Sequence, residues 1–165
     1  DLMSIIAATQ HLSDFHADHR IQVCEVSSAT VELAALALGV APQRIAKTLA
    51  FRDEEGAILV VAAGDAKIDN AKFKAQFAMK ARMLNPEETL EKVGHAVGGV
   101  CPFGVKSECK IYLDVSLRRF ETVFPAVGSS NSAIELDLNE LETFSKALGW
   151  VDVCKTVNDQ EEAHE

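Results

Sequence analysis

One unbroken apolar run constrains the fold more than any other feature of this sequence. Residues 57–63 read AILVVAA and contain no polar side chain. A strand that is covered on both faces has this pattern, because its side chains alternate between two buried surfaces. Residues 45–52 are also of strand type, and the intervening DEEG at 53–56 has the length of a hairpin loop. The sequence therefore predicts a β-hairpin at the centre of the core.

The rest of the chain predicts a mixture of helices and short strands. Apolar spacing, cap residues and glycine stops predict helices at residues 4–19, 30–38, 69–77, 85–94 and from Asp137 or Asn139 to about Leu148. Ser28 is the expected N-cap of the second helix and Gly39 its stop. Further strands are expected at residues 21–26, 81–84, 110–114, 122–126, 133–136 and 150–153, with a loop at 95–104.

Length and composition favour one domain. The chain has 165 residues, of which 48% are hydrophobic and 25% charged, as is usual for a globular protein. These elements predict a mixed α/β (α+β) fold: a single domain over residues 1–157, with a curled mixed sheet of about six to seven strands and flanking helices. Residues 158–165 are acidic and lack a base, so we expect a disordered tail there.

The charge distribution bears on possible partners. The formal net charge is −9, which disfavours tight, non-specific binding of polyanions. Residues 44–119 nevertheless hold thirteen bases against ten acids, a local charge of +3. This stretch predicts either a mildly basic face or a solvated surface of mixed charge.

The four cysteines indicate a reducing compartment. Cys24, Cys101, Cys109 and Cys154 are widely spaced and form neither a C-x-x-C pair nor a zinc-finger pattern. The sequence shows neither the features of a signal peptide nor a run of about 20 apolar residues. We therefore expect a cytoplasmic protein with no membrane association and no metal.

Two features remain as candidates for chemistry once common motifs are excluded. The sequence lacks a P-loop, H-E-x-x-H, G-x-S-x-G and a dinucleotide-binding glycine pattern. Lys47 is a single cation in an apolar strand, where it either meets an anion or lies on an exposed face. Residues 98–104, GGVCPFG, could bring backbone N–H groups close to a ligand or form an ordinary turn.

Five sequence motifs that occur in a fixed order are together specific enough to indicate a protein family. They are G-V-x-P-x-x-I-x-K-T-L-x-F-R at 39–52, G-D-A-K-I-D at 64–69, V-G-G-V-C-P-F-G at 97–104, Y-L-D at 112–114 and V-G-S-S-N-S-A-I-E-L at 127–136. This series resembles the YbaK family of aminoacyl-tRNA deacylases, which is related to the editing domain of prolyl-tRNA synthetase. The resemblance extends over residues 26–153.

The resemblance implies a YbaK-like fold and hydrolysis of the ester that joins a wrong amino acid to a tRNA, without metal or cofactor. Lys47 matches the family's signature polar residue, and the resemblance leads us to expect that Lys47, Gly99 and Cys101 are catalytic. The loop at 98–104 would act through its backbone N–H groups. The expected substrate-binding residues are Thr48, Gly98, Val100, Pro102, Phe103, Gly104, Asp114, Ser129, Ser130 and Asn131. Lys47 could hold the phosphate or ribose of the terminal adenosine, or polarise the ester.

The resemblance also implies partners and leaves the substrate open. It implies an aminoacylated tRNA 3′ end as partner, allows an aminoacyl-tRNA synthetase as a second one, and suits a monomer or weak homodimer. Residues 129–132 read SSNS where relatives have a different turn. The resemblance implies a small amino acid such as Ala, Ser, Thr or Cys, carried on tRNA-Pro or a related tRNA, and a hydroxyl-lined pocket favours a small polar one. The alternatives are a non-catalytic binding module that senses aminoacyl-tRNA, an amino acid or a nucleotide, and a thiol enzyme that uses Cys101.

Overall fold

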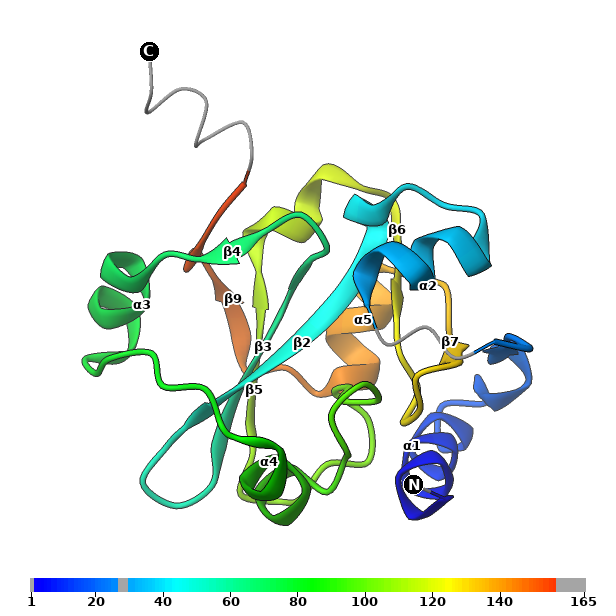
Figure 1. Ribbon diagram of the computed structural model, residues 1–165, viewed down its shortest axis with the longest axis horizontal. Helices are drawn as coiled ribbons and strands as arrows, with labels where there is room; N and C mark the ends of the chain where they lie inside the picture. Colours follow the sequence, from blue (N-terminus) through cyan, green and yellow to red (C-terminus); the bar gives the residue numbers. More distant parts are fainter. Residues whose placement is uncertain (1, 27–29, 157–165) are drawn as a thin grey trace.

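A curled sheet of six strands organises the molecule (Figure 1). In spatial order its strands are β8 (Leu136–Asp137), β6 (Thr122–Pro125), β2 (Ile45–Arg52), β3 (Ala57–Ala63), β5 (Lys110–Asp114) and β9 (Gly149–Val151). The computed structural model describes residues 2–26 and 30–156. The mixed α/β fold predicted from the sequence is confirmed.

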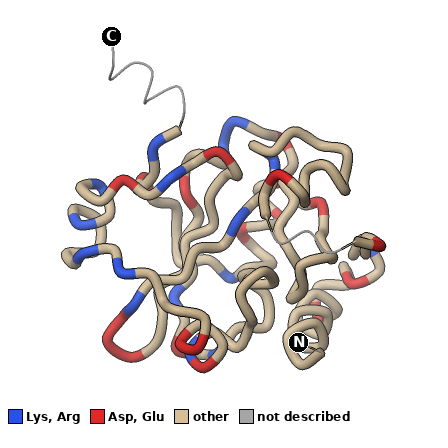
Figure 2. The backbone as a smooth tube through the Cα atoms, in the orientation of Figure 1, with Lys and Arg blue, Asp and Glu red and all other residues tan. Residues whose placement is uncertain are grey.

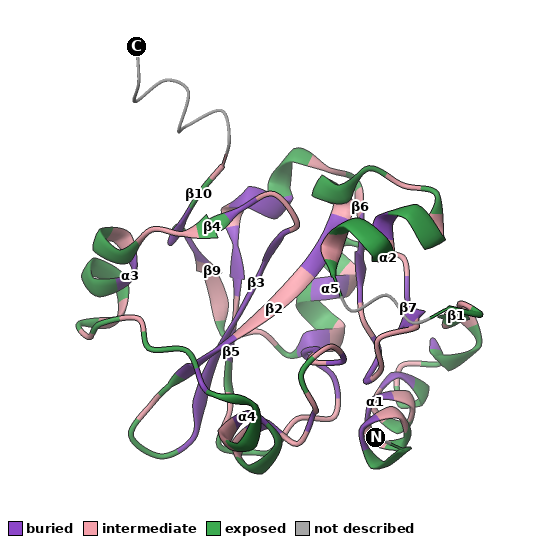
Figure 3. Cartoon of the chain, in the orientation of Figure 1, coloured by how far each residue is buried: buried purple, intermediate pink, exposed green. Residues whose placement is uncertain are grey.

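The predicted central hairpin is present residue for residue. β2 and β3 pair antiparallel from Ala46 opposite Ala63 to Arg52 opposite Ala57. Every residue of β3 is buried, as its unbroken apolar sequence predicts (Figure 3). β3 also pairs in parallel with β5, so both of its edges are bonded and both of its faces are covered.

Within residues 2–26 and 30–156, two small sheets and five α-helices surround the main sheet. β1 (Gln22–Val23) pairs with β7 (Ser132–Ala133), and β4 (Lys67–Ile68) pairs with β10 (Cys154–Lys155). The helices are α1 (Leu2–Ser13), α2 (Val31–Leu38), α3 (Asn70–Phe77), α4 (Pro86–Val93) and α5 (Leu138–Ser145). Short 3-10 turns lie at Asp18–Arg20, Pro42–Arg44 and Val115–Arg119. In the described part of the chain, none of these helices is long and apolar enough to cross a membrane.

Local cap chemistry explains where the helices begin. Asp69 accepts two backbone N–H bonds at the start of α3. Capping boxes open α4, through Asn85, and α5, through Asp137. Thr30 caps α2, whose end is marked by Gly39 in the left-handed conformation. The predicted cap Ser28 lies outside the described residues.

Two helices end earlier than their periodicity predicts. α1 ends at Ser13 rather than residue 19, because the chain reverses at His16, which has a φ of 58°. The reversal lets Phe15 stack on Phe144 at a centroid distance of 4.8 Å. α5 ends at Ser145 rather than Leu148, since Lys146 has a φ of 56°.

Several predicted strands are shorter than expected. Residues 21–26 contribute only β1, and 81–84 form only a bridge between Met83 and Phe51. The expected strand at 133–136 is split between β7 and β8, which pair with different neighbours. An apolar pattern produces a strand only where a neighbouring strand offers hydrogen-bonding partners. The predicted tail at 158–165 lies outside the described residues.

Candidate functional site

The central strand β2 has an open edge. β6 pairs with β2 only at Ile45 and Ala46. Further along, the Ala50 carbonyl accepts the Leu84 N–H at 3.0 Å. Because residues two apart direct their backbone groups to the same edge, the N–H and C=O of Thr48 face the gap between these two attachments. The described residues supply no backbone partner for Thr48 on that side.

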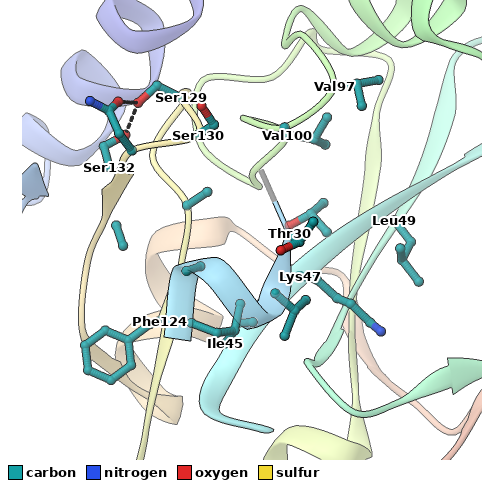
Figure 4. Close-up of a pocket in the computed structure, with 18 of the residues that line it drawn as sticks. Thr30, Ile45, Lys47, Leu49, Val97, Val100, Phe124, Ser129, Ser130 and Ser132 are labelled. Carbon is teal, nitrogen blue, oxygen red and sulfur yellow. Dashed lines mark hydrogen bonds between the residues drawn. The ribbon is translucent and has the colours of Figure 1, made fainter. Parts of the chain in front are cut away.

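A pocket of about 280 Å³ lies along this open edge (Figure 4). Its walls are β2, α2, the segment 97–100, the end of β6 and the turn 129–132. Of the predicted site residues, Lys47, Thr48, Gly98, Val100, Ser129, Ser130 and Asn131 line it. The fold thus brings together three segments that are far apart in the sequence.

The ammonium group of Lys47 is engaged by the backbone beside the pocket. Its Nζ donates to the carbonyl oxygens of Gly64, at 3.2 Å, and Ala66, and Figure 4 shows this nitrogen turned away from Thr30. Burial lowers the pKa of Lys47, and the negative charges of Asp65 and Glu32 oppose that shift. An ammonium group has three N–H donors, so one donor remains beyond the two carbonyls.

The hydroxyl groups of the turn 129–132 bond mainly to one another and to the backbone. Ser129 Oγ donates to Asn131 Oδ1 at 2.8 Å and is 2.5 Å from Ser132 Oγ. Asn131 Nδ2 donates to the Cys24 carbonyl at 3.1 Å. These bonds order the turn, so this wall is less available to a polar substrate than its sequence suggests.

The other predicted residues of the glycine-rich loop lie behind the pocket. Gly99, Cys101, Pro102, Phe103 and Gly104 are not among the lining residues. The Gly99 N–H donates to the Ala96 carbonyl at 3.0 Å, whereas Val100 contributes to the pocket wall. Gly98 and Val100 are therefore the residues of this loop that a ligand in the pocket would contact.

The structure does not suit a thiol mechanism. Cys101 is fully buried, and burial raises the pKa of its thiol to about 12. A thiol of this kind is not ionised near neutral pH and is a poor nucleophile.

Asp114 also lies outside the pocket, where its bonds hold the backbone together. Its carboxylate accepts the backbone N–H groups of Ser116 and Val153, each at 2.9 Å. It therefore joins the end of β5 to the segment that precedes β10.

The wall formed by α2 was not predicted from the sequence. Thr30, Val31, Ala34 and Leu38 line the pocket together with Phe124 of β6. The composition of this helix could have indicated it, because the helix carries apolar residues on more than the one face that packs on the core. Leu33 and Leu36, for example, remain 50% and 79% exposed.

Thr48 carries a buried polar atom without a partner. Its Oγ1 has no hydrogen bond within the described part of the protein. Buried hydroxyl groups are normally satisfied, so an unpaired one in a pocket wall is a candidate partner for a polar ligand atom or a water molecule. Among the same residues, no group of three or more His, Cys, Asp or Glu could hold a metal ion.

The fold corresponds to that of a tRNA-editing protein. A crystal structure of a candidate trans-editing enzyme for prolyl-tRNA synthetase matches with a TM-score of 0.83 and 28% identity, over 92% of this chain and 97% of that one. The model of the aminoacyl-tRNA editing domain family matches residues 25–144, and the chain belongs to this family. The resemblance to YbaK-type editing domains is thereby confirmed.

Two relatives show how widely the domain is used. The uncharacterized protein YwhH of Bacillus subtilis is 54% identical over 154 residues, which are 93% of this chain and 98% of that protein. Proline–tRNA ligase of Thermotoga maritima is 33% identical over 129 residues, 78% of this chain but only 22% of the ligase. The same domain therefore occurs alone and as part of a synthetase.

Proposed function

We propose that this protein is a trans-editing deacylase that hydrolyses the ester of mischarged aminoacyl-tRNA. The observation that carries the proposal is the pocket at the open edge of β2, in a chain of the aminoacyl-tRNA editing domain family. The amino acid would enter this pocket, and the tRNA would remain outside it. We assign a small amino acid such as Ala, Ser, Thr or Cys, on tRNA-Pro or a related tRNA.

The proposed chemistry uses hydrogen-bond donors and an oriented water. Water attacks the ester carbonyl and gives up a proton; the ester C–O bond then breaks, and the ribose oxygen leaves as a hydroxyl that takes up a proton. The attack places negative charge on the carbonyl oxygen, and donors fixed beforehand stabilise that charge. We assign this task to the third N–H of Lys47 and to the backbone N–H of Val100. The bonds to Gly64 and Ala66 then hold the ammonium group in place, which limits the reorganisation needed during the reaction.

The residues that line the pocket favour some of the candidate amino acids over others. Carbon atoms of α2 and β6 form much of the wall, and the serines at 129 and 132 bond to each other. Such a wall favours an alanine or cysteine side chain. The unpaired Thr48 hydroxyl is the group that would accept or donate a bond to the α-amino group, the ester or a polar side chain.

A basic surface near the pocket would receive the tRNA. Lys and Arg residues gather on and around α3 (Figure 2). The exposed members are Lys67, Lys74, Lys80, Arg82 and Lys155, which we call the α3 basic surface. Its segment 80–82 leads directly to Met83 and Leu84, which line the pocket. Phosphates of the acceptor end could bind here while the aminoacylated 3′ end reaches β2.

The decisive experiment is a deacylation assay with tRNAs carrying Ala, Ser, Thr or Cys. We expect the wild-type protein to hydrolyse at least one of them, and Lys47→Ala to lower kcat/KM by about 100-fold, the usual effect of removing one oxyanion donor. Lys146→Ala, at an exposed lysine after α5, serves as the matched control. Full activity of Lys47→Ala would contradict the catalytic role of Lys47.

One observation favours a second candidate function, a non-catalytic sensor. The described pocket wall contains only two ionisable side chains, Lys47 and Cys24, and thus no carboxylate or imidazole to serve as a general base. Binding of a mischarged tRNA without turnover, for all four amino acids, would identify the protein as a sensor and exclude the deacylase.

A further inference from the structure

The two loops that face the pocket share a support on their far side. Gly99 of the first loop packs against the second: a Cβ atom at Gly99 would lie 2.7 Å from backbone atoms of Gly128 and Ser129. Behind both loops runs α1, which lies outside the residues matched by the family model. Close backbone packing and two histidine side chains connect α1 to the loops.

The backbone of α1 touches one glycine in each loop. A Cβ atom at Gly104 would lie 2.4 Å from the Ala7 carbonyl oxygen, and one at Gly128 would lie 2.5 Å from that of Ser4. Such distances allow no side chain, and both glycines have positive φ, 64° and 77°. The helix is thus packed directly on the backbone of both loops.

His11 of α1 forms a hydrogen-bonded link to the glycine-rich loop. Its Nδ1 accepts the backbone N–H of Gly104 at 2.9 Å, and its Nε2 is 2.6 Å from the carbonyl oxygen of Phe144. Since Nδ1 accepts, Nε2 carries the ring proton and donates it to Phe144. One imidazole therefore joins the loop, α1 and α5.

A second link runs through a buried pair, Ser4 and His95, and reaches the loop at the neighbouring residue, Phe103. Ser4 of α1 bonds to Nδ1 of His95, and Nε2 of His95 lies 2.6 Å from the carbonyl oxygen of Phe103. Ser4 and His95 are both fully buried. Burial lowers the pKa of His95, which is consistent with a neutral ring that donates at Nε2 and accepts at Nδ1.

We propose that α1 positions the two pocket loops for the reaction, and that His11 is the positioning residue for the glycine-rich loop. His11 does not touch the pocket; it acts through Gly104, while Val100 of the same loop lines the pocket. A backbone donor must be held within a fraction of an ångström to stabilise a transition state, so a loosened loop lowers kcat more than it raises KM. This role rests on the proposed deacylase function.

The test compares His11→Ala with His11→Asn. The Asn side chain can place Oδ1 where Nδ1 lies and so accept the Gly104 N–H, whereas Ala cannot. His19→Ala removes an exposed histidine outside this network and is the matched control. Two kinds of measurement are made for each protein: amide hydrogen exchange at Gly104 and in residues 127–131, and steady-state kinetics (kcat and KM) with the mischarged tRNA that the wild type hydrolyses.

We expect His11→Ala to accelerate exchange at Gly104 about tenfold and to lower kcat about tenfold. Tenfold is the effect of losing a hydrogen bond of about 1.4 kcal/mol. KM should change less than about threefold. His11→Asn should recover most of both quantities, and His19→Ala should match the wild type. Unchanged exchange in His11→Ala would refute the link, and accelerated exchange with an unchanged kcat would refute the positioning role. If the wild type hydrolyses no mischarged tRNA, the deacylase proposal fails, while the exchange data still decide whether α1 holds the loop.

Discussion

The hydroxyl of Thr48 is buried in the pocket wall without a partner, which makes this residue the most informative one to change. A buried hydroxyl that forms no hydrogen bond costs about 1–3 kcal/mol of stability. A substrate atom that bonds to it recovers this free energy on binding. Stability and activity should therefore respond in opposite directions when the hydroxyl is removed.

Thr48→Val tests this expectation, because valine keeps the branched shape and loses only the hydroxyl. We expect the free energy of unfolding to stay equal or rise by about 1 kcal/mol, and kcat/KM to fall about tenfold. Thr89→Val is the control within the same pocket, since the Thr89 hydroxyl donates to the Asn85 carbonyl at 2.8 Å. It should lower stability instead. A stabilised Thr48→Val protein with undiminished kcat/KM would show that the substrate does not use this hydroxyl.

At the scale of elements, the packing between α1 and the loops depends on the absence of a side chain at Gly104. Gly39, the C-cap of α2, has a similar φ of 70° but nothing within 4 Å of an added Cβ. The two positions therefore separate the cost of a left-handed backbone from the cost of a collision with α1.

We expect Gly39→Ala to lower the free energy of unfolding by about 1 kcal/mol, the strain of the left-handed conformation alone. Gly104→Ala adds a clash with the Ala7 carbonyl and should cost at least about twice as much. Urea denaturation of both variants measures the difference. Equal midpoints and equal slopes for the two variants would mean that a side chain at residue 104 does not clash with α1.

At the scale of the whole molecule, the charge of −9 and the α3 basic surface act together. Under the proposed function, the net charge would repel a tRNA at long range, and the local group of bases would attract the phosphates closest to the pocket. The sequence allowed either a basic face or a mixed surface in this region. The fold places Lys80 and Arg82 on the segment that leads to the pocket.

The double variant Lys80→Gln/Arg82→Gln should lower kcat/KM for a mischarged tRNA by about tenfold at low salt. It should also reduce the slope of log kcat/KM against log salt concentration by about 1 for each phosphate group that the variant no longer binds. Lys146→Gln, at an exposed lysine just after α5, should change neither quantity. A slope identical to that of the wild type would place the tRNA elsewhere on the surface.

Much of the fold could be predicted because its strongest signals are local. The unbroken run of β3 and the cap at Asn85 depend on residues adjacent in the chain, and both predictions are confirmed. Of the two candidate caps for the last helix, Asp137 and Asn139, the structure shows Asp137, and Asp69, predicted as the first residue of its helix, is the N-cap instead. The short strands could not be predicted to length, because β7 and β8 end where their different partners end.

The candidate site could be predicted in part. The order of the motifs indicated Lys47, the glycine-rich loop and the turn at 129–132, and the fold brings members of all three to one pocket. The hydrogen-bond partners of these residues could not be predicted from the sequence. Lys47, for example, bonds to Gly64 and Ala66, which lie in a turn after the neighbouring strand. The contribution of α2 also required knowledge of which face it turns toward β2.

The sequence by itself determined the class of fold, the central hairpin and the family resemblance, because hydrophobic pattern, cap chemistry and motif order are properties of neighbouring residues. Only the tertiary structure decided that β6 leaves β2 after Ala46 and so opens an edge, and that Gly104 and Gly128 rest on α1. These features follow from packing between distant segments, where the distance between two backbones depends on every layer around them.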